Sequence, residues 1–321
     1  MGPDPTLHPE ALGRRILPPG SPELRALVRR RPLRVWADTL GCYAVLIAAF
    51  ILLAMHPTWW SYALVFLVVG NRQYALSILT HDGDHRTLFD KRGANDWFAE
   101  ILLCPPVGVD FPGEKQNHGN HHRHFPTPND PDRYLYLAAD KATRGQLFLF
   151  LTGLTMFPRA LRKALRGSPN PVREPHPVRR FLRRRAITLI VQALIFGAMW
   201  MVFPWYYYFV FWVGPIYPLV FVPHKVRMFC EHAQAQIPDE AADGRRLITY
   251  MPGPVERLLF SPFNLNHHVE HHLWPFVPYY NLPALHRLVA GRPEVEVRRS
   301  YLGFIRGFLR RLPLVDAPPP A

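Results

Sequence analysis

The histidines of this chain gather in short stretches, and the densest of these places four within six positions. This stretch runs from Asn264 to Pro275. If it is helical, His268, His271 and His272 lie at positions i, i+3 and i+4 on one face, so three imidazoles can converge on one point. Imidazole is the commonest metal ligand among protein side chains. The stretch therefore predicts a metal site.

Two further clusters also place histidines one helical turn apart. His81 and His85 are separated by four positions, and His118, His121 and His122 repeat the i, i+3, i+4 spacing. Taken alone, the first pair could be two interfacial histidines beside capping acids. The repetition of the triple makes chance a poor explanation, so the three clusters together indicate one polynuclear metal site.

A ninth ligand is expected outside the three clusters. The best candidate is His232, which follows an apolar segment on the same side as the clusters, although a histidine packed in the core is its alternative role. Additional candidate ligands are His267 and His224, and also His124, which lies out of phase with its cluster. The remaining histidines are isolated and are expected not to bind metal: His8, His56, His176 and His286.

Neutral imidazoles with few carboxylates suit a borderline transition metal better than Mg²⁺ or Ca²⁺, which prefer oxygen ligands. Nine ligands exceed the shell of one ion, so two ions are expected, and iron fits if the chemistry uses O₂. Four acids stand beside or within the clusters and are expected to accept the second ring N–H of a ligand histidine: Asp82, Asp84, Glu231 and Glu270. A solvated acid at a helix end is the alternative role of each.

The elements that carry the clusters alternate between apolar and basic segments. Four apolar runs approach the roughly 20 residues that cross a bilayer, namely 40–55, 59–79, 186–203 and 206–222. Two shorter apolar stretches, 97–109 and 147–157, are expected to lie in the membrane interface. The predicted fold is an all-α integral membrane protein with about four transmembrane helices in two hairpins, interfacial helices and a cytosolic histidine-rich cap.

The charge distribution orients this arrangement. The chain has 38 Lys and Arg against 24 Asp and Glu, a net charge of +14. The arginines flank apolar runs instead of forming one continuous basic face, so a membrane surface is expected as partner and nucleic acid is not. Both hairpin tips lack Lys and Arg, whereas the other connections are basic. The positive-inside rule therefore predicts a multi-pass protein whose termini and histidine clusters lie in the cytoplasm.

Three regions are predicted along the chain. Residues 1–35 form a basic, Pro-rich cytoplasmic tail without the apolar core of a signal peptide. Residues 36–300 form the membrane domain with its metal-binding cap, and 301–321 form a C-terminal tail. The three cysteines lie far apart, without the spacing of a thiolate metal site, and are expected to be reduced, buried thiols: Cys42, Cys104 and Cys230.

The three clusters, in this order on the cytosolic side of two hairpins, resemble the integral-membrane fatty acid desaturase family. The matching motifs are His-x-x-x-His at His81, His-x-x-His-His at His118 and His-x-x-His-His at His268, and the similarity covers roughly residues 35–295. The sequence Glu-His-His-Leu-Trp-Pro, which begins at Glu270, closely resembles that of bacterial members. The resemblance therefore implies a location in a bacterial inner membrane.

The resemblance also implies a chemistry. It implies a non-haem di-iron centre with O₂ as co-substrate, and a separate electron donor such as a ferredoxin, a rubredoxin or a cytochrome b5-like protein. The substrate would be a lipid or acyl chain from the bilayer, in which an unactivated methylene is oxidised and a double bond forms. Hydroxylases and carotenoid ketolases carry the same clusters, so they remain alternatives. The basic region 159–185 is a candidate docking surface for an acidic donor or for the membrane.

One departure from the family pattern concerns the position four residues before His232. Some desaturases have Asn there, whereas this chain has Met228. A tenth ligand is therefore not assigned.

Two other classes compete with a lipid oxidase. A histidine-rich metal transporter would carry ligands along its membrane spans, whereas the clusters stand at helix ends and no inverted repeat is visible. A membrane hydrolase with histidine-bound zinc needs fewer histidines than this chain offers. The number and placement of the histidines therefore favour lipid oxidation.

Overall fold

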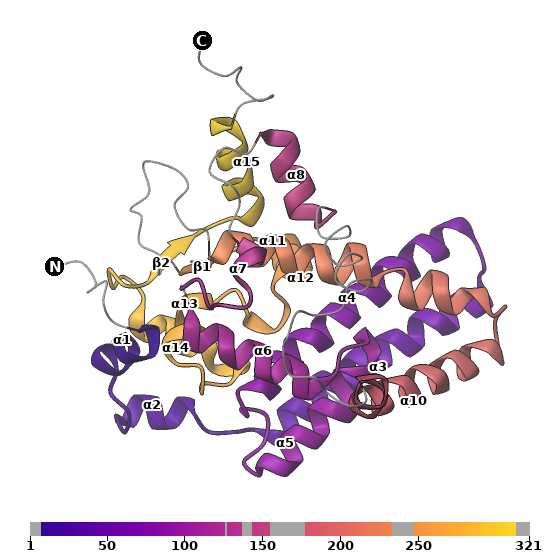
Figure 1. The fold of residues 1–321 in the computed structure, drawn as a ribbon, viewed down its shortest axis with the longest axis horizontal. Helices are drawn as coiled ribbons and strands as arrows, with labels where there is room; N and C mark the ends of the chain where they lie inside the picture. The colour runs from indigo at the N-terminus through magenta and orange to yellow at the C-terminus, as the bar shows by residue number, and fades with distance from the viewer. Residues whose placement is uncertain (1–7, 126, 137–142, 155–176, 233–246, 313–321) are drawn as a thin grey trace.

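The computed structural model describes residues 8–125, 127–136, 143–154, 177–232 and 247–312. The regular secondary structure of this part is helical apart from two three-residue strands, β1 (Ile248–Tyr250) and β2 (Glu296–Arg298), which pair in parallel. Figure 1 shows long helices that project to one side and a group of short helices on the other. The predicted all-α fold is confirmed.

The first predicted hairpin consists of α3 (Pro32–Met55) and α4 (Trp59–Asp84), both long and apolar enough to cross a membrane. Thr58 and Ser61 form a capping box that begins α4 directly after the turn. Because α4 continues beyond its apolar run, it carries His81 on its last turns. The bilayer span and the first histidine cluster therefore share one rigid element.

The last spanning helix is longer than predicted, because it continues from Tyr208 to Glu231 instead of ending near residue 222. Two π-helical segments, η3 (Tyr208–Val213) and η4 (Tyr217–Phe221), precede its α-helical end, α11 (Val222–Glu231). Pro218 and Pro223 lack the N–H that would bond the preceding turn, which favours such irregular turns in a helix. The extension places His232 at the C-terminal cap of α11.

In the part of the chain that the structure describes, three helices are long and apolar enough to cross a membrane, against the four or so expected. The segment expected at residues 186–203 is helical, as part of α10 (Pro177–Trp200), but its apolar portion Arg185–Trp200 falls short of the length that the other three reach. Arginines at the start of α10 reduce its apolar length. The hairpin that it forms with the last spanning helix persists, since Tyr208 and Trp212 both donate hydrogen bonds to Gln192.

The remaining described helices are short and build the cap or lie beside the spans. The first apolar stretch expected at the interface forms α5 (Arg92–Phe98), η1 (Ala99–Leu103) and η2 (Pro105–Val107), and the second forms α8 (Arg144–Thr152). The cap contains α6 (Phe111–His124), α7 (Arg133–Tyr136), α12 (Pro254–Phe260), η5 (Pro262–Asn264), α13 (His268–Leu273), η6 (Tyr279–Asn281) and α14 (Leu282–Val289).

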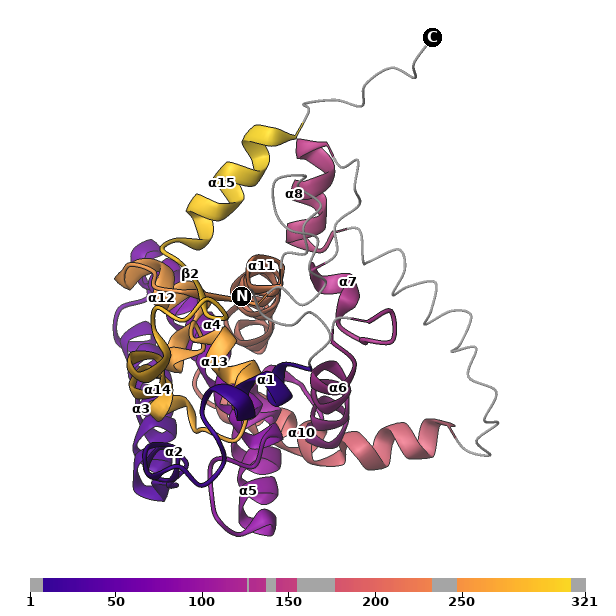
Figure 2. The same cartoon turned by 90° about the vertical axis from the view of Figure 1, so that its left-hand side faces the viewer.

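The two segments expected as tails, 1–35 and 301–321, contain helices in the parts that the structure describes. Helices α1 (Pro9–Ile16) and α2 (Pro22–Leu27) pack on the cap, and Gly13 of α1 lies so close to the Leu273 carbonyl that a Cβ would overlap it. At the other end, α15 (Tyr301–Arg311) lies beside α8 in both views (Figure 2). Residues 159–176, including His176, and 313–321 lie outside the described part.

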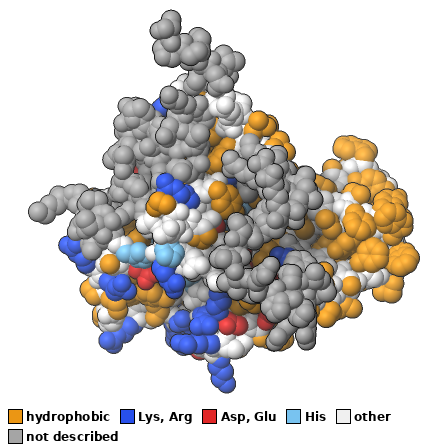
Figure 3. All heavy atoms as spheres, viewed as in Figure 1, with side chains coloured by type: hydrophobic (Ala, Val, Ile, Leu, Met, Phe, Trp, Pro, Cys, Tyr) orange, Lys and Arg blue, Asp and Glu red, His pale blue; other side chains and the backbone are white. Residues whose placement is uncertain are grey.

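Apolar and basic side chains lie on different parts of the surface. Figure 3 shows hydrophobic side chains gathered over the projecting helices, whereas Lys and Arg side chains gather over the cap. Large exposed apolar residues such as Ile47, Leu67 and Leu194 lie on α3, α4 and α10. Exposed apolar surface of this extent suits a lipid environment. The three cysteines are buried and free, as expected.

Candidate metal centre

The first set of converging imidazoles contains five histidines, each offering one nitrogen within 4.8 Å of the others. We call it the outer group: His81, His85, His118, His122 and His271. Two nitrogen pairs face one another, His85 Nε2 and His118 Nε2 at 2.7 Å and His122 Nε2 and His271 Nε2 at 3.0 Å. The group joins the end of α4 to α6 and α13, so all three predicted clusters contribute to it.

The second set lies beside the first. His121, His232 and His272 bring their nitrogens within 4.8 Å of one another, and His268 Nε2 lies 2.8 Å from His232 Nε2. We call these four residues the inner group. The rings of His122 and His272 stack with their centroids 4.3 Å apart, so the two groups adjoin. All nine predicted ligand histidines belong to one group or the other.

His268, His271 and His272, expected from their spacing to converge on one point, divide between the two groups, and the second triple divides in the same way. His118 and His122 point into the outer group while His121 points into the inner group. In α13, His271 joins the outer group while His268 and His272 join the inner one. Positions i and i+4 lie about 40° apart around a helix, whereas adjacent positions lie about 100° apart. In each pair of adjacent histidines, one ring therefore points into the outer group and the other into the inner group.

The inner group leaves buried nitrogen atoms without hydrogen-bond partners among the described residues. His121 Nε2 and His272 Nε2 are two such atoms, and both side chains are nearly inaccessible to water. A buried ring nitrogen without a partner loses its hydration without compensation. A cation held between these nitrogens would compensate for that loss, so the donor set fits a transition metal.

The protonation of the imidazoles also suits metal binding. Burial lowers the pKa of His85 to about 3, and burial followed by the charges of neighbouring histidines holds the pKa values of His118, His122 and His272 well below their usual range. Neutral imidazoles keep the lone pair that a metal needs. At neutral pH these side chains are therefore ready to coordinate.

An aspartate that was not among the predicted acids orients one histidine. The Nδ1 of His121 lies 2.9 and 3.0 Å from the two carboxylate oxygens of Asp130, and the Tyr136 hydroxyl donates to the same carboxylate at 2.5 Å. This leaves the His121 Nε2 directed into the inner group. The sequence offers one clue, because Asp130 and Asp132 flank a proline in the short polar loop behind the second cluster.

Glu231 lies where a supporting acid was expected. Its carboxylate is 3.2 Å from His268 Nδ1, and it also accepts hydrogen bonds from Arg227 at 2.6 Å and from the Tyr301 hydroxyl at 2.9 Å. The C-terminal helix α15 thus reaches the metal centre through Tyr301. Because all three side chains of this network are buried and hydrogen-bonded, the carboxylate beside His268 is held firmly in place.

The other predicted acids have different partners. Asp82 accepts hydrogen bonds from the Thr87 hydroxyl and from the Tyr279 backbone N–H, so it ties the end of α4 to η6. The carboxylate of Asp84 is buried without a hydrogen-bond partner among the described residues. Glu270 accepts hydrogen bonds from Thr249 and His286.

The histidines outside the predicted set divide by position. His267 lies with Glu270 and His286 in a third set, apart from the two groups. Burial is the main cause of the lowered pKa of His232, followed by the charges of His121 and Arg227. His224, on α11, is near enough to contribute in the same direction. His124 belongs to neither group, and the His8 ring bonds the backbone carbonyl of His122 at 2.8 Å.

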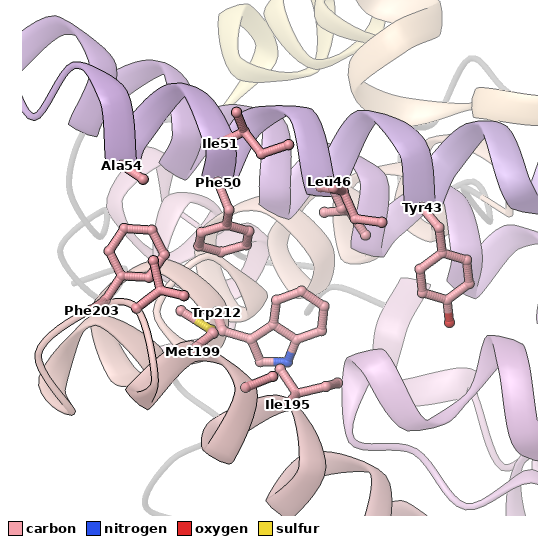
Figure 4. A pocket seen from close by; sticks show the side chains of 12 residues that line it. Tyr43, Leu46, Phe50, Ile51, Ala54, Ile195, Met199, Phe203 and Trp212 are labelled. Carbon is pink, nitrogen blue, oxygen red and sulfur yellow. The ribbon is translucent and has the colours of Figure 1, made fainter.

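An apolar pocket of about 370 Å³ opens between α3 and α10 (Figure 4). Phe50 of α3, Met199 of α10 and Trp212 of η3 project into it, together with Phe203 from the turn after α10. Its walls are apolar almost throughout and belong to the projecting, membrane-facing part of the molecule: Tyr43, Leu46, Ile47, Phe50, Ile51, Ala54, Ile195, Ala198, Met199, Val202, Phe203 and Trp212. The pocket suits an acyl chain.

Taken together, the fold and the site describe a protein with membrane-spanning helices and, at the ends of these helices, two adjoining histidine groups that could each hold a metal ion. The sequence model of the fatty acid desaturase family matches residues 57–302. This chain belongs to the fatty acid desaturase family.

Curated relatives cover most of the chain. It is 27% identical to the sphingolipid delta(4)-desaturase/C4-monooxygenase DES2 of Bos taurus over 83% of this chain and 77% of that protein. It is 26% identical to the sn-1 acyl-lipid omega-3 desaturase (ferredoxin) of Synechocystis, over 74% of this chain and 70% of that protein. The prediction of a desaturase-like oxidoreductase of lipid metabolism is confirmed.

Proposed function

We propose that the outer and inner groups hold two iron ions and that the chain uses O₂ to introduce a double bond into the acyl chain of a membrane lipid. The observation that carries this proposal is the adjacency of two histidine groups at the ends of membrane-spanning helices. When bound, such an iron pair supplies the O₂ activation that removes hydrogen from an unactivated methylene. Nine imidazoles shared between two ions match that requirement.

The chain's own residues contribute positioning and exclusion of water. Asp130 fixes the ring of His121, and Glu231 lies against that of His268, which directs both imidazoles into the inner group. Tyr43 and Ala54, near the ends of the apolar pocket, are eleven residues apart on α3, which corresponds to about 16 Å of helix. We assign this pocket to the distal part of the acyl chain, because its apolar walls favour methylene groups over water.

Hydroxylation is the second candidate reaction. Both reactions begin with removal of one hydrogen from a methylene. Removal of a second hydrogen gives a double bond, whereas addition of oxygen to the carbon gives an alcohol. The name of the Bos taurus relative combines a desaturase with a C4-monooxygenase, which favours hydroxylation as the alternative over the ketolase reaction.

The electrons would come from a separate donor. Family membership implies such a partner, and the name of the Synechocystis relative contains ferredoxin. We therefore place a ferredoxin before a rubredoxin or a cytochrome b5-like protein. We also propose a bacterial inner-membrane location with cytoplasmic termini, supported by the basic segment 25–34, which ends in the first turn of α3.

Expression in a bacterial host followed by mass spectrometry of total lipids tests the reaction. Loss of two mass units from an acyl chain indicates desaturation, and gain of sixteen indicates hydroxylation. The purified chain should carry two irons, and His271→Ala should leave the host lipids unchanged while the protein still inserts into the membrane. A single zinc per chain, or full activity of the variant, would overturn the di-iron proposal.

A further inference from the structure

A second pocket, of about 420 Å³, lies between α4 and α12 and is lined by two arginines. Arg72 comes from the membrane-spanning helix α4, and Arg257 comes from α12. The wall between them includes Leu258 and Phe263. Charged side chains within membrane spans are energetically costly and usually mark a functional site.

Neither arginine has an acidic partner in the part of the chain that the structure describes. The guanidinium of Arg72 donates to the side-chain carbonyl of Asn71, and that of Arg257 donates to the side-chain carbonyl of Asn264. The neighbouring acid, Glu256, is instead bonded to Ser300 and to the backbone of Tyr301. Arg72 also lies beside the Cys42 thiol of α3. Each guanidinium has five N–H donors, so donors remain on both arginines for an anion.

The pocket opens where the protein meets lipid. On α12, Val255 is 71% exposed and Leu258 is 51% exposed. Helix α12 is fixed against α4, because Asn71 Nδ2 donates to the Leu258 carbonyl at 2.8 Å and the Tyr74 hydroxyl donates to the Phe260 carbonyl at 2.8 Å (Figure 1). Exposed apolar side chains beside two cations match the boundary between acyl chains and phosphate head groups.

Two elements that line this pocket also lead along the chain to histidines of the two groups. Phe263 and Asn264 adopt left-handed backbone angles, with φ of 54° and 64°, which are strained for residues other than glycine. Phe263 packs against the cluster of Tyr74, Ile78 and Leu265. Four residues beyond Asn264 the chain reaches His268, and along α4 the nine residues from Arg72 to His81 correspond to about 13 Å.

We propose that this pocket binds the phosphate of a glycerophospholipid whose acyl chain is the one oxidised. The inference rests on the proposed function and names its substrate class. Two guanidinium groups suit phosphate because each can donate two parallel hydrogen bonds to its oxygens. The apolar rim selects a phosphate anchored in the bilayer over a soluble one. Lipids without phosphate lack the group that Arg72 and Arg257 would hold.

Kinetics of the reconstituted full-length protein test this inference. The probes are phosphatidylglycerol, diacylglycerol with the same acyl chains, and the corresponding acyl coenzyme A. We expect Arg257→Gln to raise the KM for phosphatidylglycerol by about 10- to 100-fold, the factor for losing charge-assisted hydrogen bonds, while kcat stays unchanged. Arg257→Lys should have an intermediate effect, and Arg306→Gln, on the exposed face of α15, should have none.

Binding provides a readout that does not depend on turnover. Native mass spectrometry should show phosphatidylglycerol bound to the wild-type protein and lost in Arg257→Gln. If the variant retains the wild-type KM and lipid binding, or if the wild type prefers diacylglycerol or acyl coenzyme A, the head-group inference is overturned. If the wild type binds phosphatidylglycerol through Arg257 but oxidises no lipid, the pocket stands and the proposed function fails.

Discussion

The outer and inner histidine groups use the same side chain in different surroundings. In the outer group, His81, His85 and His118 are partly accessible, and no carboxylate bonds any of its five rings among the described residues. The inner group is fully buried, and acids lie behind two of its rings.

If each group holds one iron ion, as proposed, this difference predicts that the two ions are bound with different strength. A carboxylate behind an imidazole fixes the ring and raises its basicity, so the inner position is expected to hold its ion firmly. In the outer group no carboxylate fixes a histidine ring among the described residues, and three of its histidines are partly accessible to solvent. These surroundings suit exchange of ligands and approach of a substrate. The predictions below test this asymmetry.

Replacement of neighbouring histidines in α13 should give the largest effect. His271→Ala removes an outer ligand and His272→Ala an inner ligand, although the two residues are adjacent. We expect both variants to lose activity and each to lose one of the two irons, as measured by metal analysis of the purified proteins. His124→Ala, outside both groups, is the control. Retention of both irons by either variant would contradict the assignment.

Glu231→Gln should mainly lower stability. The side chains of Arg227 and Glu231 are both buried, so neutralising one leaves a buried charge without its partner, which costs about 3–5 kcal/mol. Thermal unfolding in detergent measures the change. Glu296, which is partly exposed and pairs with the partly exposed Arg298, supplies the control Glu296→Gln, expected to have a smaller effect. Equal unfolding temperatures for the two variants would argue against a structural role for the buried pair.

Asp130→Asn should weaken the inner position without unfolding the chain. Loss of a carboxylate behind a ligand histidine reduces metal affinity or activity by about 10–100-fold. Tyr136→Phe, which removes only the hydroxyl that bonds Asp130, should have a smaller effect in the same direction. Titration with a chelator measures iron affinity. If Asp130→Asn binds iron as tightly as the wild type, the asymmetry between the groups does not come from this carboxylate.

Gly13→Ala should give the smallest effect. A Cβ at this position overlaps the Leu273 carbonyl next to His272, so α1 must move away from α13, at a cost of about 1–3 kcal/mol. Gly41→Ala, in α3 where the added methyl meets nothing within 4 Å, is the control and should be neutral or slightly stabilising. Calorimetry of both variants, with iron content, shows whether α1 supports the inner group.

Much of the site could be predicted because its information is local. A His-x-x-His-His motif fixes ligand type and spacing within one helix, and apolar length fixes which segments can span a bilayer. The irregular path of Tyr208–Glu231 could not be predicted, since prolines permit a π-helical turn without specifying it. Asp130 was missed for a related reason: its contact with His121 depends on how the loop after α6 folds back.

The nine histidines, the helical hairpins and the family could be recognised from the amino-acid sequence alone, because they depend on residue type and short-range periodicity. The tertiary structure decided which histidine belongs to which group, because adjacent positions on α6 and α13 point about 100° apart. It also decided that helices α1 and α15 close the cap, and that Arg72 and Arg257, distant in the chain, line one pocket. Such contacts depend on packing between elements, which local patterns do not encode.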